Sequence, residues 1–326
     1  SLSDKKKDWK ERERLFEDVF MGKPYPSKIT AGHIELKFAG NLKHVRYSLD
    51  LDNACITVTD GEEPLAEIFM SGKVNVGVIR CFKKCEVAFH VPAYLSGKPK
   101  GKSGIGNSAA NLSLAYPEAV HRKNGAFCWY EQPTRTDYSF GIVTYETNGV
   151  IYYALVTTDD DRDYIAYGKN MLKNAAKFGY EDLLAAHKKE WRDYWLLSSV
   201  TTNNELIDAT YRKSWYLFKC CSLKGWYPMP LQGVWTADND CLPPWKGDYH
   251  HDTNTELSYQ SYLKANRLEC GEAFTDYLWK LKPAYEKFAC DFFGVDGLLI
   301  PSCSTLDGKP MGGWAQYSLS PTMTIW

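Results

Sequence analysis

Between residue 34 and about residue 157, apolar and polar residues alternate in short runs that are rich in β-branched and aromatic side chains. A period of two is typical of strands that bury one face, and turn-forming pairs such as Asp60-Gly61 separate the runs. Many short strands at this spacing indicate an antiparallel β-sandwich. We predict strands at residues 44–52, 54–60, 67–72, 76–82, 86–91, 111–116, 139–147 and 150–157.

Beyond Thr157 the apolar positions recur every three or four residues, which is the period of helices. In the last such segment, Pro283 predicts a break or kink and Gly294 predicts a C-terminal cap. The predicted helices lie at residues 159–175, 180–197, 204–222, 253–266 and 268–293. We therefore predict a β-sandwich domain with an N-terminal helix at 1–157, a helical linker at 158–200, and a helical domain that looks unfinished at 201–326.

The stretch from Leu231 to Gln260 gathers tryptophans and polar side chains around a predicted helix start. Three aromatic residues offer flat faces, while amides and imidazoles offer directional hydrogen bonds. This combination suits a sugar ring, which has apolar C–H faces and a rim of hydroxyl groups. The flat faces come from Trp235, Trp245 and Tyr249, and the polar groups from Gln232, His250, His251 and Asn254.

The helix in this stretch begins with Thr253 and Glu256, which have the spacing of a capping box. Asp252 directly precedes the first turn, where the partial positive charge of the helix end is expected to favour an ionised carboxylate and lower its pKa. Such a group suits a general base better than an acid. The same residues would also make a good helix entrance in a protein without chemistry at this position, and this alternative stays open.

Metal and nucleotide sites are not expected from the sequence. His250 and His251 are adjacent, so their side chains point apart, and no further ligands stand nearby at a typical spacing. The loop at 97–103 resembles a phosphate loop, but it has too few residues between its glycines and no amphipathic helix after it. We interpret this loop as a surface hairpin, and we expect no cofactor.

Charge and hydropathy argue against several classes of partner. The chain has 39 Lys and Arg against 40 Asp and Glu, which argues against nucleic-acid binding. No apolar run approaches the ~20 residues that span a bilayer, so we expect no membrane insertion. The chain begins at Ser1 without a methionine and without a signal-peptide core, so its start would follow either a removed leader or a cloning remnant. We predict a secreted or periplasmic protein, with the cytoplasm as an open alternative.

Four segments carry a resemblance to a known family: LQGVW at 231–235, PPW at 243–245, YHHDTNTEL at 249–257 and, more weakly, YSLDLD at 47–52. They resemble glycoside hydrolase family 95, the inverting α-L-fucosidases and α-L-galactosidases. The resemblance implies a β-sandwich followed by an (α/α)6 toroid of helical hairpins, of which residues 201–326 would be the first, incomplete part. The implied substrate is an oligosaccharide or glycan that ends in α-L-fucose or α-L-galactose.

In that family, two asparagines separated by one residue, with a distant aspartate, hold and activate the attacking water, and a glutamate on a later helix is the general acid. The second asparagine corresponds to Asn254, and the first is replaced here by Asp252. We hypothesise that Asp252 is the base or shares that role, while Asn254 orients the water. The general acid would lie after Trp326. The expected sugar contacts are Gln232, Trp235, Trp245, Tyr249 and His250.

Two alternatives to this hydrolase remain open at the level of the sequence. A glycan-binding protein of the same fold would account for the lack of a convincing general acid in the chain. A glycoside phosphorylase would place phosphate where the hydrolase holds water, although the carboxylate of Asp252 would repel that anion.

Overall fold

The computed structural model describes Glu11, Arg14 and residues 23–98, 111–236, 241–251, 253–301 and 303–311. The chain divides into two compact units. The sheet unit comprises Ala31–Ser96 and Ala115–Tyr216, and the helical unit comprises Ser1–Thr30, Gly97–Leu114 and Leu217–Trp326. Most of the predicted N-terminal helix and most of the loop at 97–103 lie outside the described residues.

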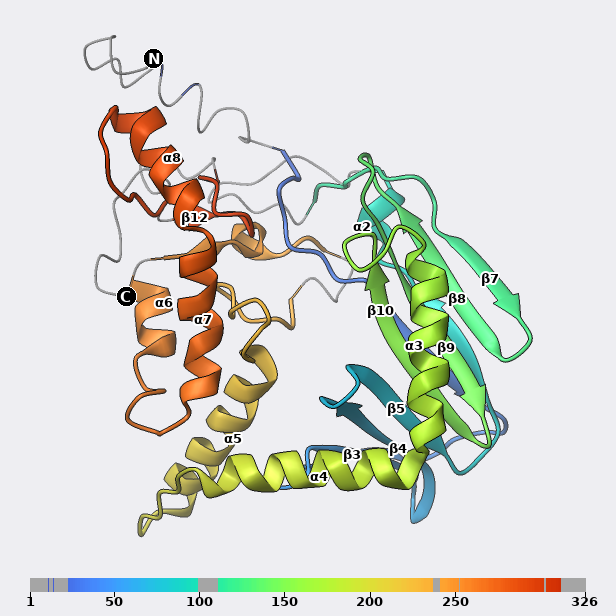
Figure 1. Ribbon diagram of the computed structural model, residues 1–326. Helices are drawn as coiled ribbons and strands as arrows, with labels where there is room; N and C mark the ends of the chain where they lie inside the picture. Colours follow the sequence, from blue (N-terminus) through green and yellow to red (C-terminus); the bar gives the residue numbers. More distant parts are fainter. Residues whose placement is uncertain are drawn as a thin grey trace. The chain divides into compact units, whose positions relative to one another are not determined.

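The sheet unit is built on an antiparallel sheet of eight strands in the order β2-β3-β4-β5-β10-β9-β8-β7 (Figure 1). Every neighbouring pair in this sheet is antiparallel, as the alternating sequence pattern predicts. The strands are β2 Val45–Asp50, β3 Cys55–Asp60, β4 Glu63–Ser71, β5 Val76–Cys81, β7 Val120–Asn124, β8 Phe127–Pro133, β9 Ser139–Thr147 and β10 Val150–Thr157. Both edge strands, β2 and β7, are exposed along their whole length.

A second, smaller sheet covers part of one face of the large sheet. It consists of β1 His33–Phe38 and β6 Cys85–His90, which pair in antiparallel register. Its inward side chains, among them Leu36, Phe38 and Val87, pack on a buried cluster of Val58, Leu65, Ala66, Ile79 and Ile151. The predicted β-sandwich is therefore present, with two layers of very unequal size.

Two helices, α3 Tyr164–Phe178 and α4 Tyr180–Leu196, pack on the sheet unit with their apolar sides (Figure 1). Ile165, Leu172 and Ala175 of α3 join a core with strand residues such as Val143 and Val156. The predicted linker helices are thus part of the sheet unit's packing, and the proposed domain boundaries stay predictions. Helix α3 begins later than expected, because Asp163 is the residue whose side chain caps it, accepting from the Ala166 amide at 3.1 Å.

In the sheet unit, the sequence pattern did not predict three strands and one short helix, and one predicted strand is absent. Strands β1, β7 and β8 and the helix α2 Ala93–Ser96 were not expected. The strand expected at 111–116 does not form, because Ala115 adopts a left-handed conformation with φ of 50° that interrupts an extended chain. Strand β7 has no buried residue, so its sequence carries no apolar alternation.

Among the residues that the structure describes, the helical unit contains α6 Thr253–Tyr259, α7 Leu268–Lys280 and α8 Lys282–Phe293, while α5 Glu205–Cys221 leads into it from the sheet unit. The predicted break at Pro283 separates α7 from α8, and Gly294 ends α8 in a left-handed conformation with its amide bonded to the Cys290 carbonyl. None of the helices in the described ranges is long and apolar enough to cross a membrane.

The buried face of α6 differs from the predicted one. A continuous helix over 253–266 would place Leu257, Tyr262 and Leu263 on one apolar face, yet Leu257 and Leu263 are 64% and 60% exposed while Tyr262 is buried. The helix ends at Tyr259, so the helical period does not continue to residue 266. Tyr259 is fully buried instead, with its hydroxyl bonded to the Ser222 hydroxyl and to the Met229 amide.

Candidate active site

A short β-ribbon forms the framework of the candidate site in the helical unit. Strand β11 Tyr249–His250 pairs antiparallel with β12 Cys303–Ser304, so His250 lies opposite Cys303. The Leu231 amide donates to the Asp248 carbonyl at 2.9 Å, which joins the start of the tryptophan-rich stretch to this ribbon. The pairing thus brings a distant segment of the chain against the predicted sugar-binding stretch.

A buried group of three side chains lies on this ribbon. The Nδ1 atom of His250 is 2.8 Å from Oδ2 of Asp248, whose side chain is fully buried. Burial raises the pKa of the Asp248 carboxyl, and the hydrogen bond with His250 opposes that rise. The hydrogen bond fixes the orientation of the imidazole ring.

The sulfur of Cys303 lies 3.5 Å from both ring nitrogens of His250. Asp248, His250 and Cys303 are close enough to be considered as metal ligands. Their geometry is that of a packed, hydrogen-bonded cluster.

A tight turn precedes the ribbon and places an indole against His250. The 3-10 turn η2 Pro244–Gly247 contains two consecutive left-handed residues, Trp245 and Lys246, both with φ of 55°. The Trp245 ring meets the His250 ring edge-to-face with centroids 5.4 Å apart. Lys246 is buried, which lowers its pKa to about 8, while the negative charge of Asp248 acts in the opposite direction.

His251 points into the core of the helical unit. It is fully buried among aromatic rings, stacked with Tyr249 and with Phe274 at centroid distances of 5.7 and 6.0 Å. Within the described residues, neither of its ring nitrogens has a hydrogen-bond partner. Desolvation lowers its pKa to about 3, so the ring is neutral in the folded protein. His251 is therefore a core residue, and the expectation that it offers hydrogen bonds to a sugar is wrong.

Because the buried His251 ring stays neutral in the folded state, we expect the protein to lose stability in acid. In the unfolded chain its pKa returns to about 6.5, so below that pH the unfolded state binds a proton that the folded state does not. Between about pH 7 and about pH 5, the wild type should lose ~2 kcal/mol more of its free energy of unfolding than His251→Phe, which keeps the aromatic stack. Urea unfolding at both pH values measures this difference. Parallel pH profiles for the two proteins would contradict it.

The predicted site residues divide by exposure. Tyr249 and His250 are buried, the Tyr249 hydroxyl donates to the Pro228 carbonyl at 3.0 Å, and Trp245 is half-buried beside His250. Gln232, Trp235 and Asn254 are exposed, with Trp235 56% accessible. Asp252 lies outside the described residues. The structure thus brings Trp245 and His250 together, whereas Tyr249 packs with His251 and Tyr277. The sugar contacts stay predictions.

Sequence reasoning missed two members of the buried cluster. Asp248 and His250 are separated by one residue on either side of a strand start, so their side chains share a face. That spacing was a signal that could have been used. Cys303 carried no such signal, because its partner in the ribbon lies far away in the sequence.

Comparison with known protein families identifies the helical part of the chain. Residues 181–326 match the family described as glycosyl hydrolase family 95 catalytic domain. This segment is similar to that domain. The match includes the whole stretch from Leu231 to Gln260 and the ribbon with Cys303. It confirms the resemblance to family 95. The predicted start of the catalytic domain at residue 201 stays a prediction.

Comparison with solved structures finds one similar chain. It is a bacterial glucoamylase complexed with acarbose, with 14% sequence identity and a TM-score of 0.48. The similarity covers 88% of this chain and 48% of that chain, so this chain spans about half the length of the glucoamylase. Comparison with curated protein sequences finds no match. The family 95 assignment therefore rests on the match at residues 181–326.

Proposed function

We propose that the chain is part of a glycoside hydrolase that removes a terminal α-L-fucose or α-L-galactose from a glycan with inversion at the anomeric carbon. The observation that carries this proposal is the family 95 match across the segment that holds Asp252 and Asn254. Asn254 is exposed in the first turn of α6, as a residue that orients a water molecule must be.

The turn that carries Asn254 is tied to the buried ribbon. The Thr255 hydroxyl, which is buried, donates a hydrogen bond to the His250 carbonyl. His250 is itself held by Asp248, so the start of α6 rests on an internal hydrogen-bonded group. A rigid support of this kind favours catalysis, because an attacking water must be held close to its reactive geometry.

In the proposed mechanism, the Asp252 carboxylate removes a proton from the water while the Asn254 side chain orients it. The water attacks the anomeric carbon, and a second carboxyl group protonates the leaving oxygen. Inverting enzymes place the two carboxyl groups about 6.5–9.5 Å apart, which leaves room for the water. Flat aromatic residues such as the exposed Trp235 are suited to the apolar face of the sugar.

Asp248 is not suited to act as the acid. Its pKa is raised, as an acid requires, but its side chain is fully buried and hydrogen-bonded to His250. It therefore cannot reach a glycosidic oxygen without leaving that cluster. The acid expected from the resemblance remains a glutamate after Trp326.

A release assay with the full-length protein tests the function. Aryl α-L-fucoside and aryl α-L-galactoside are the substrates, aryl β-L-fucoside is the control, and NMR follows the anomer that appears first. We expect the β-anomer of the sugar as first product, formed without added phosphate. Release of the α-anomer would contradict inversion. Binding of the glycan without release would favour the glycan-binding alternative, and dependence on phosphate would favour a phosphorylase.

A further inference from the structure

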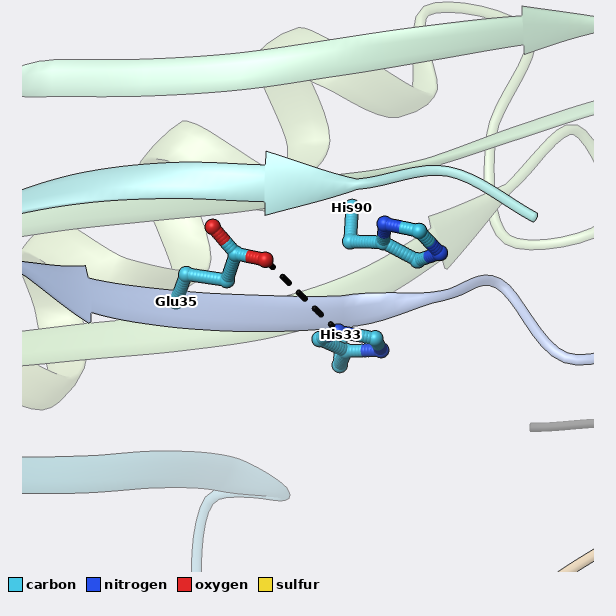
Figure 2. Close-up of side chains that lie close together, drawn as sticks. All are labelled: His33, Glu35 and His90. Atoms are coloured by element: carbon cyan, nitrogen blue, oxygen red, sulfur yellow. Dashed lines mark ion pairs between the residues drawn. The ribbon is translucent and has the colours of Figure 1, made fainter. Parts of the chain in front are cut away.

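We propose that His33, Glu35 and His90 form a binding site for Zn²⁺ on the outer face of the small sheet. This site lies within the sheet unit and is independent of the proposed hydrolase function. Each of the three side chains offers one ligand atom, and the three atoms lie within 4.8 Å of one another. Figure 2 shows the two imidazole rings side by side and the Glu35 carboxylate directed toward His33.

Strand register places the three residues on one face. His33 of β1 lies directly opposite His90 of β6, so their side chains leave the sheet on the same side. Glu35 follows His33 by two residues, which returns it to that side. The residue opposite Glu35 is Ala88, whose methyl group leaves space beside the carboxylate.

The opposite face of the same two strands holds this arrangement in place. Leu36 and Phe38 of β1 and Val87 of β6 pack against the core of the large sheet. Because inward and outward residues alternate along each strand, the anchored residues fix the backbone that carries the outward ligands. The three ligands are thus presented by a backbone that is already ordered by packing.

The distances are compatible with coordination after small side-chain rotations. The two rings are stacked with centroids 4.5 Å apart and 18° between their planes, and Nε2 of His33 is 3.9 Å from Oε1 of Glu35. Bonds of about 2.0–2.1 Å from zinc to nitrogen and oxygen require ligand atoms about 3.3 Å apart in a tetrahedron. The side chains of His33 and Glu35 are 52% and 43% exposed, so an ion can enter from solvent.

The donor set favours a transition-metal ion over calcium or magnesium. Two imidazoles and one carboxylate are a ligand set found around Zn²⁺, with a fourth position left for water, whereas calcium and magnesium prefer oxygen ligands. The Lys37 ammonium competes weakly for Glu35, from 3.9 Å. Such an exposed ion pair contributes little, and Lys37 has Glu86 opposite it in the sheet as another partner.

Neighbouring thiols are the main competitors for zinc in the sheet unit. The sulfurs of Cys81 and Cys85 lie 3.5 Å apart. Burial raises the pKa of Cys81 to about 12 and also raises that of Cys85, which disfavours the thiolates that bind metal. A zinc-binding experiment must nevertheless distinguish the site of His33, Glu35 and His90 from the two thiols.

Calorimetric titration of the untagged protein with Zn²⁺ under reducing conditions tests the proposal. We expect the wild type to bind a single zinc ion in this site, and His33→Asn, Glu35→Gln and His90→Asn each to weaken that binding at least about tenfold, because even the loss of a supporting partner costs 10–100-fold. His44→Asn, at an exposed histidine outside the site, should bind as the wild type does. Circular dichroism checks that each variant keeps its sheet.

Cobalt substitution identifies the ligands directly. Co²⁺ bound at this site should give visible d–d absorption without thiolate-to-metal charge transfer, and His90→Asn should remove it. The double variant Cys81→Ser/Cys85→Ser should leave both the absorption and the zinc affinity unchanged. Absence of zinc binding in the wild type, or equal affinity in Glu35→Gln and His90→Asn, would overturn the proposal.

Discussion

Asp252→Ala is expected to lower kcat of the full-length enzyme by about 10²–10⁴-fold, because general-base catalysis contributes a factor of this size. The folded structure should be unaffected, so the free energy of unfolding should stay close to that of the wild type. Initial rates with the aryl glycoside that is turned over best measure the loss, and urea unfolding measures the stability.

Asp252→Asn separates this proposal from the usual family arrangement. The substitution restores the asparagine that family 95 has by the resemblance, and it removes the carboxylate without changing the shape of the side chain. If Asp252 is the base, kcat should fall about as far as in Asp252→Ala. Turnover close to that of the wild type would show that another carboxylate removes the proton. Asp296→Ala, at an exposed aspartate of the same unit, is the matched control and should keep full activity.

Asp248→Ala is expected to cost the helical unit about 3–5 kcal/mol of its free energy of unfolding, the range measured when one partner of a buried ion pair is removed. The carboxylate is fully buried and lies 2.8 Å from Nδ1 of His250, and its negative charge favours the charged form of the buried Lys246. Its loss removes both interactions and opens a small cavity. Urea unfolding, followed by tryptophan fluorescence, measures the change.

Two further variants test the cause of that loss. Asp248→Asn keeps the size of the side chain and one hydrogen-bonding oxygen, so it should cost less than Asp248→Ala. Asp296→Ala should change stability by no more than about 0.5 kcal/mol, as exposed substitutions usually do. An effect of Asp248→Ala as small as that of Asp296→Ala would mean that the buried cluster contributes no net stability.

The sequence correctly predicted the elements that bury one face, because burial of one face gives their apolar residues a regular spacing. Strands β9 and β10 and helices α4, α7 and α8 lie close to the predicted ranges, because their apolar residues follow a strict period. The predictions failed where contacts with other parts of the fold, rather than the local pattern, determine the secondary structure. Edge strand β7 buries nothing, and the residues after Tyr259 depart from helix although their apolar pattern continues.

The candidate site was predictable only in part, for similar reasons. The stretch from Leu231 to Gln260 could be recognised from its composition, and the family 95 match includes it. The sequence could not show that His251 is buried among aromatic rings, since exposed and buried histidines look alike in a pattern. Nor could the sequence show that His250 lies beside Cys303, or His33 beside His90. In both cases, pairing between strands that are distant in the sequence brings the two residues together.

The exposed edge strand β7 has a consequence for how copies of the chain can meet. An open strand edge offers unpaired backbone groups to which another strand could add. In an antiparallel pair of two β7 strands centred on Arg122, that residue would lie opposite its own copy, and His121 would lie opposite Lys123. Repulsion between the two Arg122 side chains would disfavour such a pair.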